Sequence, residues 1–468
     1  MTGAIYYPRR LDGIYLLFCA PLILALIYVL PPFQAPDEAA HFYRAIQLSH
    51  GEAAPVVAPK TYRTGAGGSV DTSAYRLVDD YCGIPNWSCK QQQRPVVQDI
   101  LSPAPREAGG GQLRVVPFSN TVVYLPVAHF APAGAIFLAR AVGLSPLGWL
   151  YAGRLANALI AIATAWCSLA LLRGKPAAVL IFSVGCLPMV ASIASTLCAD
   201  SSVIGFSMLL FAICFRIVEG QDLGWGLILA LVAAVFYACA AKLAYLPLSL
   251  IPLACAIGAN RSKPLILGTA ILAICAIGVT GLWYLVIRDY VYPISQNPRV
   301  DPAAQMAYVR SHPVLFVITL IKSMILQLPY VWVTMIGRKL SDLKVLLPWA
   351  FVVWSSVVLL TGAAVSGRPN TKTLLRVSIF FILAASAAAT FAFLYLQNSA
   401  VGVPWVEGYQ GRYLIPLLPF AAFLMPPIER LQTATANWFA QVAGFSGAFA
   451  IVLLVVFLGI RSWSYSPT

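Results

Sequence analysis

Two adjacent carboxylates, Asp37 and Glu38, follow the first long apolar run of the chain. A carboxylate at a membrane surface can act as a general base that deprotonates an acceptor hydroxyl, as a ligand for a divalent cation such as Mg²⁺ or Mn²⁺, or as both. The structural alternative is that Asp37 caps a helix N-terminus and Glu38 lies in its first turn, where the helix dipole favours acids. We predict chemistry at Asp37, supported by Glu38, with Asp37 as the ligand if a metal is used.

The residues around this pair predict a helix over residues 36–50. Pro36 disfavours helix at the residue before it and suits a helix that starts near Asp37. Asp37, His41 and Arg44 then follow at i, i+4 and i+7 spacing, so they lie on one helical face. Because a cap does not require a basic polar face, His41 and Arg44 favour a site, with this face directed into a cavity.

A second acid and a lysine interrupt the apolar sequence further along. Asp200 lies between two apolar runs, where it either lines a site or caps a helix that starts at Ser201. Lys242 lies between two long apolar stretches and has no acid near it in the sequence. A lysine at that depth is costly, so it either extends its amine to the membrane surface or binds a lipid phosphate.

The segment 407–416 is the most distinctive part of the second half. Gly408 and Gly411 permit a close turn, and Arg412 presents a guanidinium suited to bidentate phosphate recognition. The alternative for Arg412 is a structural ion pair with an acid such as Glu407. The tyrosines of this segment would also fit an interfacial aromatic belt. We predict that the substrate-binding residues here are Tyr409, Gln410, Arg412 and Tyr413.

The composition excludes an ordinary soluble domain. Of the 468 residues, 60% are hydrophobic and only 10% are charged, which is typical of a polytopic membrane protein. The formal net charge of +14 does not indicate a nucleic-acid partner, because Lys and Arg form short clusters between apolar runs and no basic tract. We predict an all-α integral membrane protein whose charge sets its orientation and its contacts with anionic membrane lipid.

Several familiar motifs are absent from the sequence. It contains no phosphate loop of the Gly-x-x-x-x-Gly-Lys-Ser/Thr type, no His-Glu-x-x-His motif and no Cys/His set at metal-binding spacing. ATP-driven transport by this chain alone is therefore not expected. The other histidines, His50, His129 and His312, are isolated in the sequence, and we interpret them as structural.

Apolar runs that are long enough, or nearly so, for transmembrane helices fill most of the chain. The first, about 14–30, follows Arg9 and Arg10 and has no small-residue cleavage site after it, so we predict a retained span and not a signal peptide. Further runs lie near 119–142, 149–172, 176–197, 202–218, 224–241, 243–258, 264–287, 313–335, 345–365, 374–397, 412–428 and 437–460.

The positive-inside rule favours one arrangement of these runs. If 119–142 and 313–335 are interfacial or re-entrant helices, the cationic connections near 173–175, 261–263 and 368–376 all face the cytoplasm. In the rival scheme every run spans. Both schemes place 397–412 on the same outer side as Asp37. We predict about eleven spans, in the range 11–13, in a single transmembrane domain over residues 1–468.

One long polar segment, residues 32–118, interrupts the apolar pattern and is too long to be an idle connection. We predict that it is the first periplasmic loop. Cys82 and Cys89 are seven residues apart within it, and a disulfide between them fits a loop outside the cytoplasm. The loop is predicted to be most flexible at Gly65 to Gly68 and Gly109 to Gly111. The other eight cysteines lie in or beside apolar runs and are expected to pack as small hydrophobes.

The order of these features resembles the DUF2142 family of bacterial polytopic membrane proteins, which in turn is similar to the GT-C class of lipid-dependent glycosyltransferases. The resemblance extends over most of the chain. The blocks that carry it are 36–44 with 48–51, 187–200, Lys242 with 245–247, 312–313 and 410–416.

The resemblance implies a GT-C-like helical bundle in the bacterial inner membrane, with a cavity open to lipid and to the periplasm. There a sugar would pass from a polyprenyl-phosphate carrier to a glycan, glycolipid or protein acceptor. Asp37 would be the base or metal ligand, with Glu38 in support, and Asp200 a second acid of the site. Lys242 and Arg412 would neutralise the carrier phosphate as it leaves.

Two other interpretations fit part of the pattern. A transporter or flippase of lipid-linked saccharides would also need a cavity, cations within the membrane and an external carboxylate. A polysaccharide-assembly subunit without activity would use Asp37 as a cap and Arg412 as an ion-pair partner. The long outer loop favours the transferase, because such a loop suits a lid over a reaction site.

Overall fold

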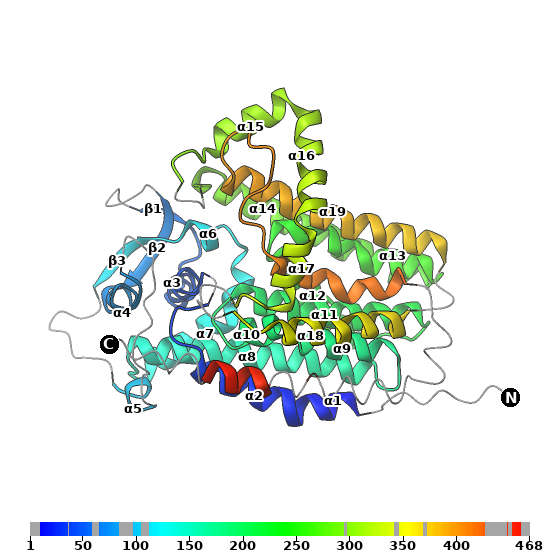
Figure 1. Cartoon of the computed structure of the whole chain (residues 1–468), viewed down its shortest axis with the longest axis horizontal. Helices are drawn as coiled ribbons and strands as arrows, with labels where there is room; N and C mark the ends of the chain where they lie inside the picture. Colours follow the sequence, from blue (N-terminus) through cyan, green and yellow to red (C-terminus); the bar gives the residue numbers. More distant parts are fainter. Residues whose placement is uncertain are drawn as a thin grey trace.

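The protein is an all-α integral membrane protein with one small sheet at one end (Figure 1). A computed structural model describes residues 10–35, 37–58, 65–83, 97–103, 112–293, 297–340, 346–367, 372–425, 447 and 452–459. Most of the long helices lie side by side along the longest axis of the molecule, while α15 (Pro302–Ser311) and α16 (Pro313–Leu326) project from its side (Figure 1).

Within the described residues, six helical stretches are long and apolar enough to cross a membrane. The first, Leu11–Val29, is a continuous run of α1, a turn of π-helix and α2, and it ends before Pro31 and Pro32. The others are α8 (Pro146–Leu171), α11 (Ala199–Val218), α14 with a 3₁₀ turn (Lys263–Tyr290), α18 (Trp349–Ser366) and α19 (Thr373–Asn398).

The count of about eleven spans is not confirmed, because several apolar runs fold as bent or shortened helices. Counting each bent pair as one span raises the total in the described residues to eight. One pair, α9 (Ala177–Gly185) and α10 (Pro188–Ala194), bends by 63°, and α15 and α16 bend by 109°. Run 119–142 is divided into α6 (Ser119–Val122), η2 (Pro126–His129) and α7 (Phe130–Ala141), and run 313–335 into α16 and α17 (Leu328–Ile336).

The two apolar runs that flank Lys242 return to the end of the molecule from which they start. The first is α12 (Trp225–Val235) with η3 (Phe236–Ala240), and the second is η4 (Leu243–Leu250) with α13 (Ile251–Gly258). Arg261, beyond the second run, donates hydrogen bonds to the carbonyl of Gln221 and to Asp222, just before the first. The two runs therefore form a helical hairpin that turns inside the bundle at Lys242.

The end of the bundle that carries these connections is joined by ion pairs. Arg173 pairs with Asp12, Lys175 with Glu219, and Arg261 with Asp222. These pairs connect the start of the first span to the loops that follow α8, α11 and α13. The cationic loops near 173–175 and 261–263 thus share one end, as the favoured arrangement of the runs predicts.

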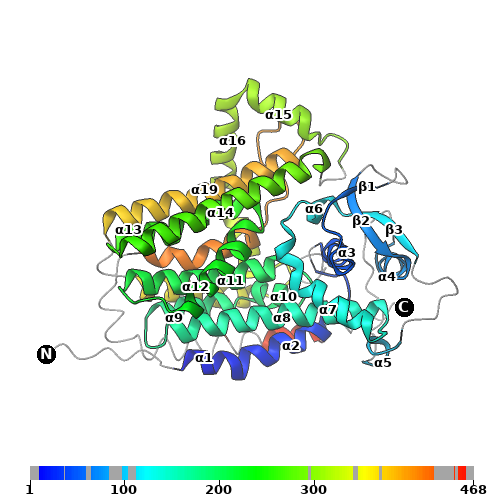
Figure 2. The ribbon, with the colours of Figure 1, turned by 180° about the vertical axis from the view of Figure 1, so that it is seen from behind.

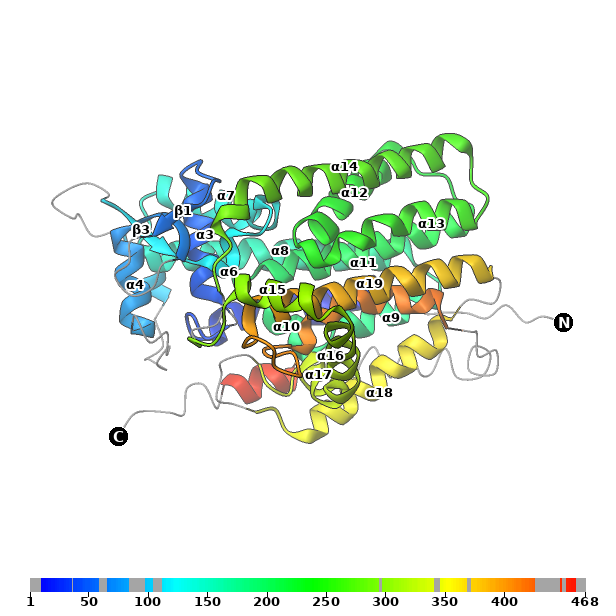
Figure 3. The same cartoon turned by 90° about the horizontal axis from the view of Figure 1, so that it is seen from above.

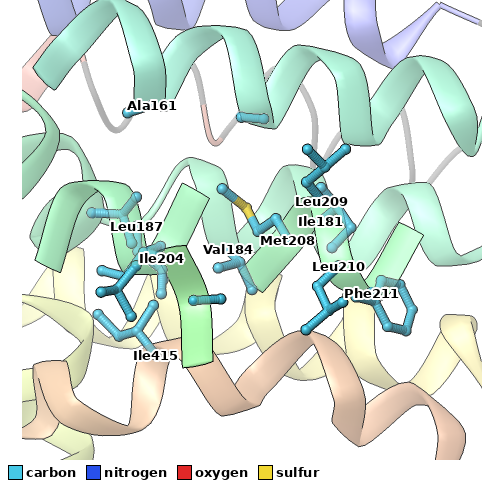
Figure 4. Close-up of a cluster of buried hydrophobic side chains, with 14 of the residues drawn as sticks. Ala161, Ile181, Val184, Leu187, Ile204, Met208, Leu209, Leu210, Phe211 and Ile415 are labelled. Carbon is cyan, nitrogen blue, oxygen red and sulfur yellow. The ribbon is translucent and has the colours of Figure 1, made fainter. Parts of the chain in front are cut away.

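The apolar core is centred on α11, which packs on α8, α12, α13, η3 and η6 (Gly411–Phe423). Figure 4 shows Ile204, Met208 and Phe211 of α11 between α8 and η6. Gly205 permits the close approach of α11 to α8, because a Cβ there would lie 2.3 Å from Oγ1 of Thr164. Small residues at such crossings let membrane helices pack closely.

A separate layer covers the opposite end of the bundle. It contains α3 (Glu38–Ser49), α4 (Thr72–Cys82) and an antiparallel sheet in the order β1 (Val56–Ala58), β2 (Gly65–Asp71) and β3 (Leu113–Pro117). The short α5 (Val97–Ile100) lies at the same end (Figure 1). Seen from behind, α3 lies between the sheet and the bundle (Figure 2). The predicted helix 36–50 is therefore confirmed as α3, although Pro36 lies outside the described residues.

The sheet corrects the prediction that Gly65 to Gly68 are a flexible point. These glycines form the first half of the central strand β2, where Gly67 pairs with Val56 and with Pro117. They serve close packing, because a Cβ on Gly68 would lie 2.3 Å from the side chain of Gln47 on α3. The second predicted flexible point, Gly109 to Gly111, lies outside the described residues.

His50, at the end of α3, is not isolated. Its Nε2 lies 2.9 Å from Asp71 of β2, and Arg140 of α7 lies 3.2 Å from the same carboxylate. Burial raises the pKa of Asp71, but the hydrogen bond from His50 and the charge of Arg140 outweigh it, so the pKa is lowered from its ordinary value. This network attaches the sheet to the bundle.

Cys82 at the end of α4 is disulfide-bonded. The eight cysteines of the apolar runs are free thiols, as expected. Cys89, the predicted partner of Cys82, lies outside the described residues, so that pairing stays a prediction.

We expect Gly67→Ala to destabilise the protein, because its Cβ would lie 1.7 Å from the carbonyl oxygen of Val116. The expected loss is about 2–4 kcal/mol of unfolding free energy, measured as a lower unfolding temperature in detergent. Gly134→Ala is the matched control, because the new Cβ meets nothing within 4 Å. Equal unfolding temperatures for the two variants would contradict the packing of β2 on β3.

Candidate functional site

Asp37 is the residue on which the candidate site is built. It lies at the N-cap position of α3 with its backbone in the left-handed region, at φ 56° and ψ 17°. Its side chain makes no capping hydrogen bond to a described residue. Instead, Oδ1 accepts a hydrogen bond from Nδ2 of Asn120 at 3.0 Å, and Oδ2 accepts one from Nη2 of Arg412 at 3.1 Å. The side chain is 46% exposed. The carboxylate is therefore accessible to solvent, and it does not cap α3.

The side chain of Glu38, by contrast, is fully buried, and its carboxylate binds other parts of the protein. Its carboxylate forms a bidentate pair with Arg154 of α8, at 2.7 Å from Nε to Oε1 and 2.6 Å from Nη2 to Oε2. The backbone N–H groups of Phe33 and Leu197 donate to the same two oxygens. These four donors fill the acceptor positions of the carboxylate. We therefore assign Glu38 a structural role in place of the chemical one predicted.

Arg154 uses the rest of its guanidinium to hold the end of the first span. Nη1 donates to the carbonyls of Ile27 and Leu30, and Nη2 donates to that of Pro31. Phe33, which follows, also has a positive φ of 60°. Strained backbone of this kind persists only where the surroundings fix it. The Glu38–Arg154 pair fixes this backbone, because Arg154 binds the carbonyls before the segment that leads to Asp37 and Glu38 follows directly after it.

A buried group of two cations and one acid lies behind Asp37. Asp200, in the first turn of α11, forms an ion pair with Lys242 at the hairpin turn. Nε of Arg412 lies 3.5 Å from Oδ2 of the same carboxylate. Asp200 is therefore a site partner and not a cap, and Lys242 neither extends to the membrane surface nor remains unpaired.

The segment that carries Arg412 reaches this group because η6 lies along α11 and α19 (Figure 3). Gly411 makes the approach possible, since a Cβ there would lie 2.0 Å from the carbonyl oxygen of Val331. Arg412 is only 4% exposed and pairs with Asp37 and Asp200. Arg412 therefore lies beside Asp37, as expected if 397–412 and Asp37 share one side of the membrane. Glu407 is not the partner of Arg412, because its carboxylate accepts a hydrogen bond from the backbone N–H of Ala400.

Aromatic side chains surround the charges. Nζ of Lys242 lies 4.7 Å from the ring centre of Tyr124 and 5.9 Å from that of Tyr413. The hydroxyl of Tyr413 accepts a hydrogen bond from Nη2 of Arg412 at 3.3 Å. Tyr409 is also buried, and its ring is stacked on that of Phe391. These contacts place Tyr413 in the site itself, with Tyr409 edge-on against it at 5.7 Å.

Gln410 contributes to the site through its backbone. It is the N-cap residue of η6, and its carbonyl accepts the N–H of Tyr413 at 3.1 Å. It therefore helps to orient Tyr413, and the structure gives no side-chain contact of Gln410 with the charged group.

His41 lies on the inner side of α3, next to the charges. Its Nδ1 is 2.9 Å from Nε2 of His129, and its Nε2 is 3.7 Å from Sγ of Cys198. Burial lowers the pKa of His41 from its ordinary value near 6.5 to about 4, and burial also lowers the pKa of His129 well below its ordinary value. Both imidazoles are thus neutral at pH 7. His129, which we interpreted as isolated, is part of this pair.

Arg44 is not brought to Asp37. It is completely buried, and Nη1 donates to the side chain of Gln47 and to the carbonyl of Ala53. Burial lowers its pKa to about 10. The prediction that Asp37, His41 and Arg44 present one polar face to a cavity is therefore wrong for Arg44, whose guanidinium supports the chain that follows α3.

The residues at Asp37 do not fit a divalent cation. Its two oxygens already accept hydrogen bonds from an amide and a guanidinium, and Asp200 is neutralised by Lys242. A metal ion here would lie beside two cations, which opposes its binding. Within the described residues, no three His, Cys, Asp or Glu side chains are grouped to hold a metal ion. We therefore derive no step from the predicted Mg²⁺ or Mn²⁺.

Sequence reasoning missed three residues that shape the site, namely Asn120, Tyr124 and Arg154. Arg154 carried a signal, because an ionisable residue within a long apolar run indicates a buried partner or a functional group. Asn120 and Tyr124 carried none, because a single amide and a single tyrosine at the start of an apolar run are common in membrane proteins.

A family model described as "Predicted membrane protein (DUF2142)" matches residues 21–421. The chain belongs to this family. The matched range includes every residue of the site described above. Searches of the curated proteins and of the solved structures returned no match.

We expect Glu38→Gln to lower the unfolding free energy of this DUF2142 protein by roughly 3–5 kcal/mol, because it leaves the buried guanidinium of Arg154 without its counter-charge. Thermal unfolding in detergent would measure the loss. Asp289→Asn is the control, because it removes one acid from an exposed pair with Arg288 and should change stability by less than about 0.5 kcal/mol. An unchanged Glu38→Gln variant would refute the structural role of the pair.

Stability should also fall between about pH 6.5 and pH 4. In this range an unfolded histidine takes up a proton, whereas buried His41, with its pKa of about 4, does not. The unfolded state therefore binds more protons, and the native state loses stability as the pH falls. His41→Gln should flatten this part of the pH profile of the unfolding temperature, whereas the same change at exposed His312 should leave it intact. An unaltered slope in His41→Gln would contradict the assignment.

Proposed function

We propose that this DUF2142 protein is a membrane glycosyltransferase that moves a sugar from a polyprenyl-phosphate carrier to a cell-envelope glycan, glycolipid or protein. The observation that carries the proposal is the contact between Asp37 and Arg412. An exposed carboxylate that is not used as a cap lies against a buried guanidinium. The first group can take a proton from an acceptor, and the second can neutralise a leaving phosphate.

The proposed reaction is a single displacement at the anomeric carbon of the sugar. The acceptor hydroxyl oxygen forms a bond to that carbon, and its proton passes to Asp37. The bond between the anomeric carbon and the carrier phosphate breaks, and the phosphate oxygen keeps the electron pair. The products are the glycosylated acceptor, the polyprenyl phosphate and a protonated carboxyl group on Asp37, which then releases its proton to solvent.

Arg412 is suited to the leaving group. Its Nη1 makes no hydrogen bond to any described residue, although the side chain is nearly fully buried. A buried donor that lacks a partner is costly, and an incoming phosphate oxygen would satisfy it. The charge of the phosphate grows as the sugar departs, so a guanidinium at this position stabilises the transition state more than the ground state. Lys242 and Asp200 hold the buried side of Arg412 in place.

Two features support an orientation in the inner membrane with the site facing the periplasm. Cys82, in the same polar segment as Asp37, is disulfide-bonded, and disulfides are typical of compartments outside the cytoplasm. Cations of the connecting loops, among them Arg173, Lys175 and Arg261, lie together at the other end of the bundle. That arrangement agrees with the excess of Lys and Arg on cytoplasmic sides of membranes.

In cells, Asp37→Asn should abolish transfer and cause the carrier-linked sugar to accumulate, because the amide cannot take up the proton of the acceptor. Mass spectrometry of surface glycans and lipid carriers would compare wild type, the variant and a deletion at matched membrane expression. The variant and the deletion should lose the same sugar.

The matched control is Asp301→Asn. Asp301 also lies at a helix N-cap, but its carboxylate caps the helix by accepting hydrogen bonds from the backbone N–H groups of Ala303 and Ala304. Asn also caps helices well, so this variant should retain the sugar. If Asp37→Asn kept a wild-type glycan while the deletion lost it, the carboxylate would not be the base and a transport or assembly role would replace the transferase.

A further inference from the structure

The four charged side chains of the site neutralise one another. Asp37 and Asp200 carry two negative charges, and Lys242 and Arg412 carry two positive charges, so the group has no net charge. A phosphate that enters this group therefore meets no free cation. It must compete with one of the carboxylates for a cation that is already paired.

The two carboxylates hold Arg412 unequally. Asp200 is buried and also pairs with Lys242, whereas Asp37 is about half exposed. A buried carboxylate that loses its partners pays a large desolvation cost, while an exposed one is re-solvated by water. The contact of Asp37 with Arg412 is therefore the one that a ligand can replace.

Two nitrogens of the Arg412 guanidinium, Nε and Nη1, have no hydrogen-bond partner among the described residues. Nε has only an ion-pair contact of 3.5 Å with Oδ2 of Asp200, and Nη2 donates to both Asp37 and the hydroxyl of Tyr413. A guanidinium binds two phosphate oxygens best when two of its N–H groups point to them together. Bidentate binding through Nη1 and Nη2 therefore brings the ligand into competition with Asp37 for Nη2.

We propose that the phosphate of an isoprenyl phosphate ligand displaces Asp37 from Arg412, and that this exchange releases Oδ2 of Asp37 to accept the proton of the acceptor. This inference rests on the proposed transferase function and adds an order to it. The donor must bind before the acceptor hydroxyl can be deprotonated, because in the free protein the same guanidinium occupies Oδ2. Asn120 keeps Oδ1 in place during the exchange.

Substitution of a binding-site residue usually weakens ligand binding, but the proposed exchange predicts the opposite for Asp37. Asp37→Asn removes the carboxylate that competes with the ligand, so it should tighten the binding of phosphate while it removes the base. We expect the Kd of farnesyl phosphate for the full-length protein in nanodiscs to fall about three- to tenfold, since the charge removed is close to the ligand but partly screened by water. Quenching of the intrinsic tryptophan fluorescence would report binding, with farnesol as the uncharged control ligand.

Three further variants make the test decisive. Asp301→Asn should leave the Kd unchanged, because its carboxylate caps α15 away from the site. Asp37→Ser removes the same charge with a different side chain and should tighten binding if Asp37→Asn fails to fold. In Arg412→Gln the effect of Asp37→Asn should vanish, because the guanidinium for which the two anions compete is gone.

The outcomes separate this inference from the proposed function. If farnesyl phosphate binds wild type no better than farnesol does, the phosphate site is absent and both proposals fail. If it binds but Asp37→Asn leaves the Kd unchanged or raises it, the exchange is wrong, while loss of the surface sugar in the same variant would leave the transferase standing. Tighter binding together with loss of the sugar supports both.

Discussion

The bidentate ion pair between Glu38 and Arg154 is the contact on which the candidate site depends. It is fully buried, and every N–H of the guanidinium is used, two of them by Glu38 and the others by carbonyls at the end of the first span. Such a pair contributes little net stability, but breaking it is expensive because a charge would remain buried alone. Its effect is to fix the geometry of the residues between Phe33 and Glu38. Asp37 keeps a left-handed backbone as a result and presents its carboxylate outward instead of capping α3.

The two acids and two cations of the candidate site come from distant parts of the chain. Asp37 precedes α3, Asp200 lies in the first turn of α11, Lys242 lies at the turn of the helical hairpin, and Arg412 lies in the first turn of η6. Each would be costly in an apolar bundle by itself, and together they neutralise one another. The fold therefore requires these residues for its own electrostatics, and the proposed chemistry uses the most exposed member of the group.

The sequence predicted the helical membrane fold, the helix after Asp37 and the proximity of Arg412 to that residue, because membrane-length apolar runs and the sidedness of loops follow from composition and charge. It did not predict the pairing of Lys242 with Asp200. The two are 42 residues apart, and only the return of the chain at Lys242 brings them together. The same hairpin shows why apolar runs alone do not give the number of spans, since each of its arms is apolar enough to be taken for a span. The glycines of β2 looked like flexible points because the pattern of glycines alone does not distinguish a hinge from a strand packed closely on its neighbours.

The separation of Asp37 and Arg412 along the chain, 375 residues, has a consequence for biosynthesis. Asp37 is made long before its partner guanidinium, which lies near the end of the segment that the family model matches. Until the ribosome has passed η6, the carboxylate has no Arg412 beside it and Asp200 has only one of its two cations. A chain that stops before η6 therefore lacks the guanidinium that pairs with both Asp37 and Asp200.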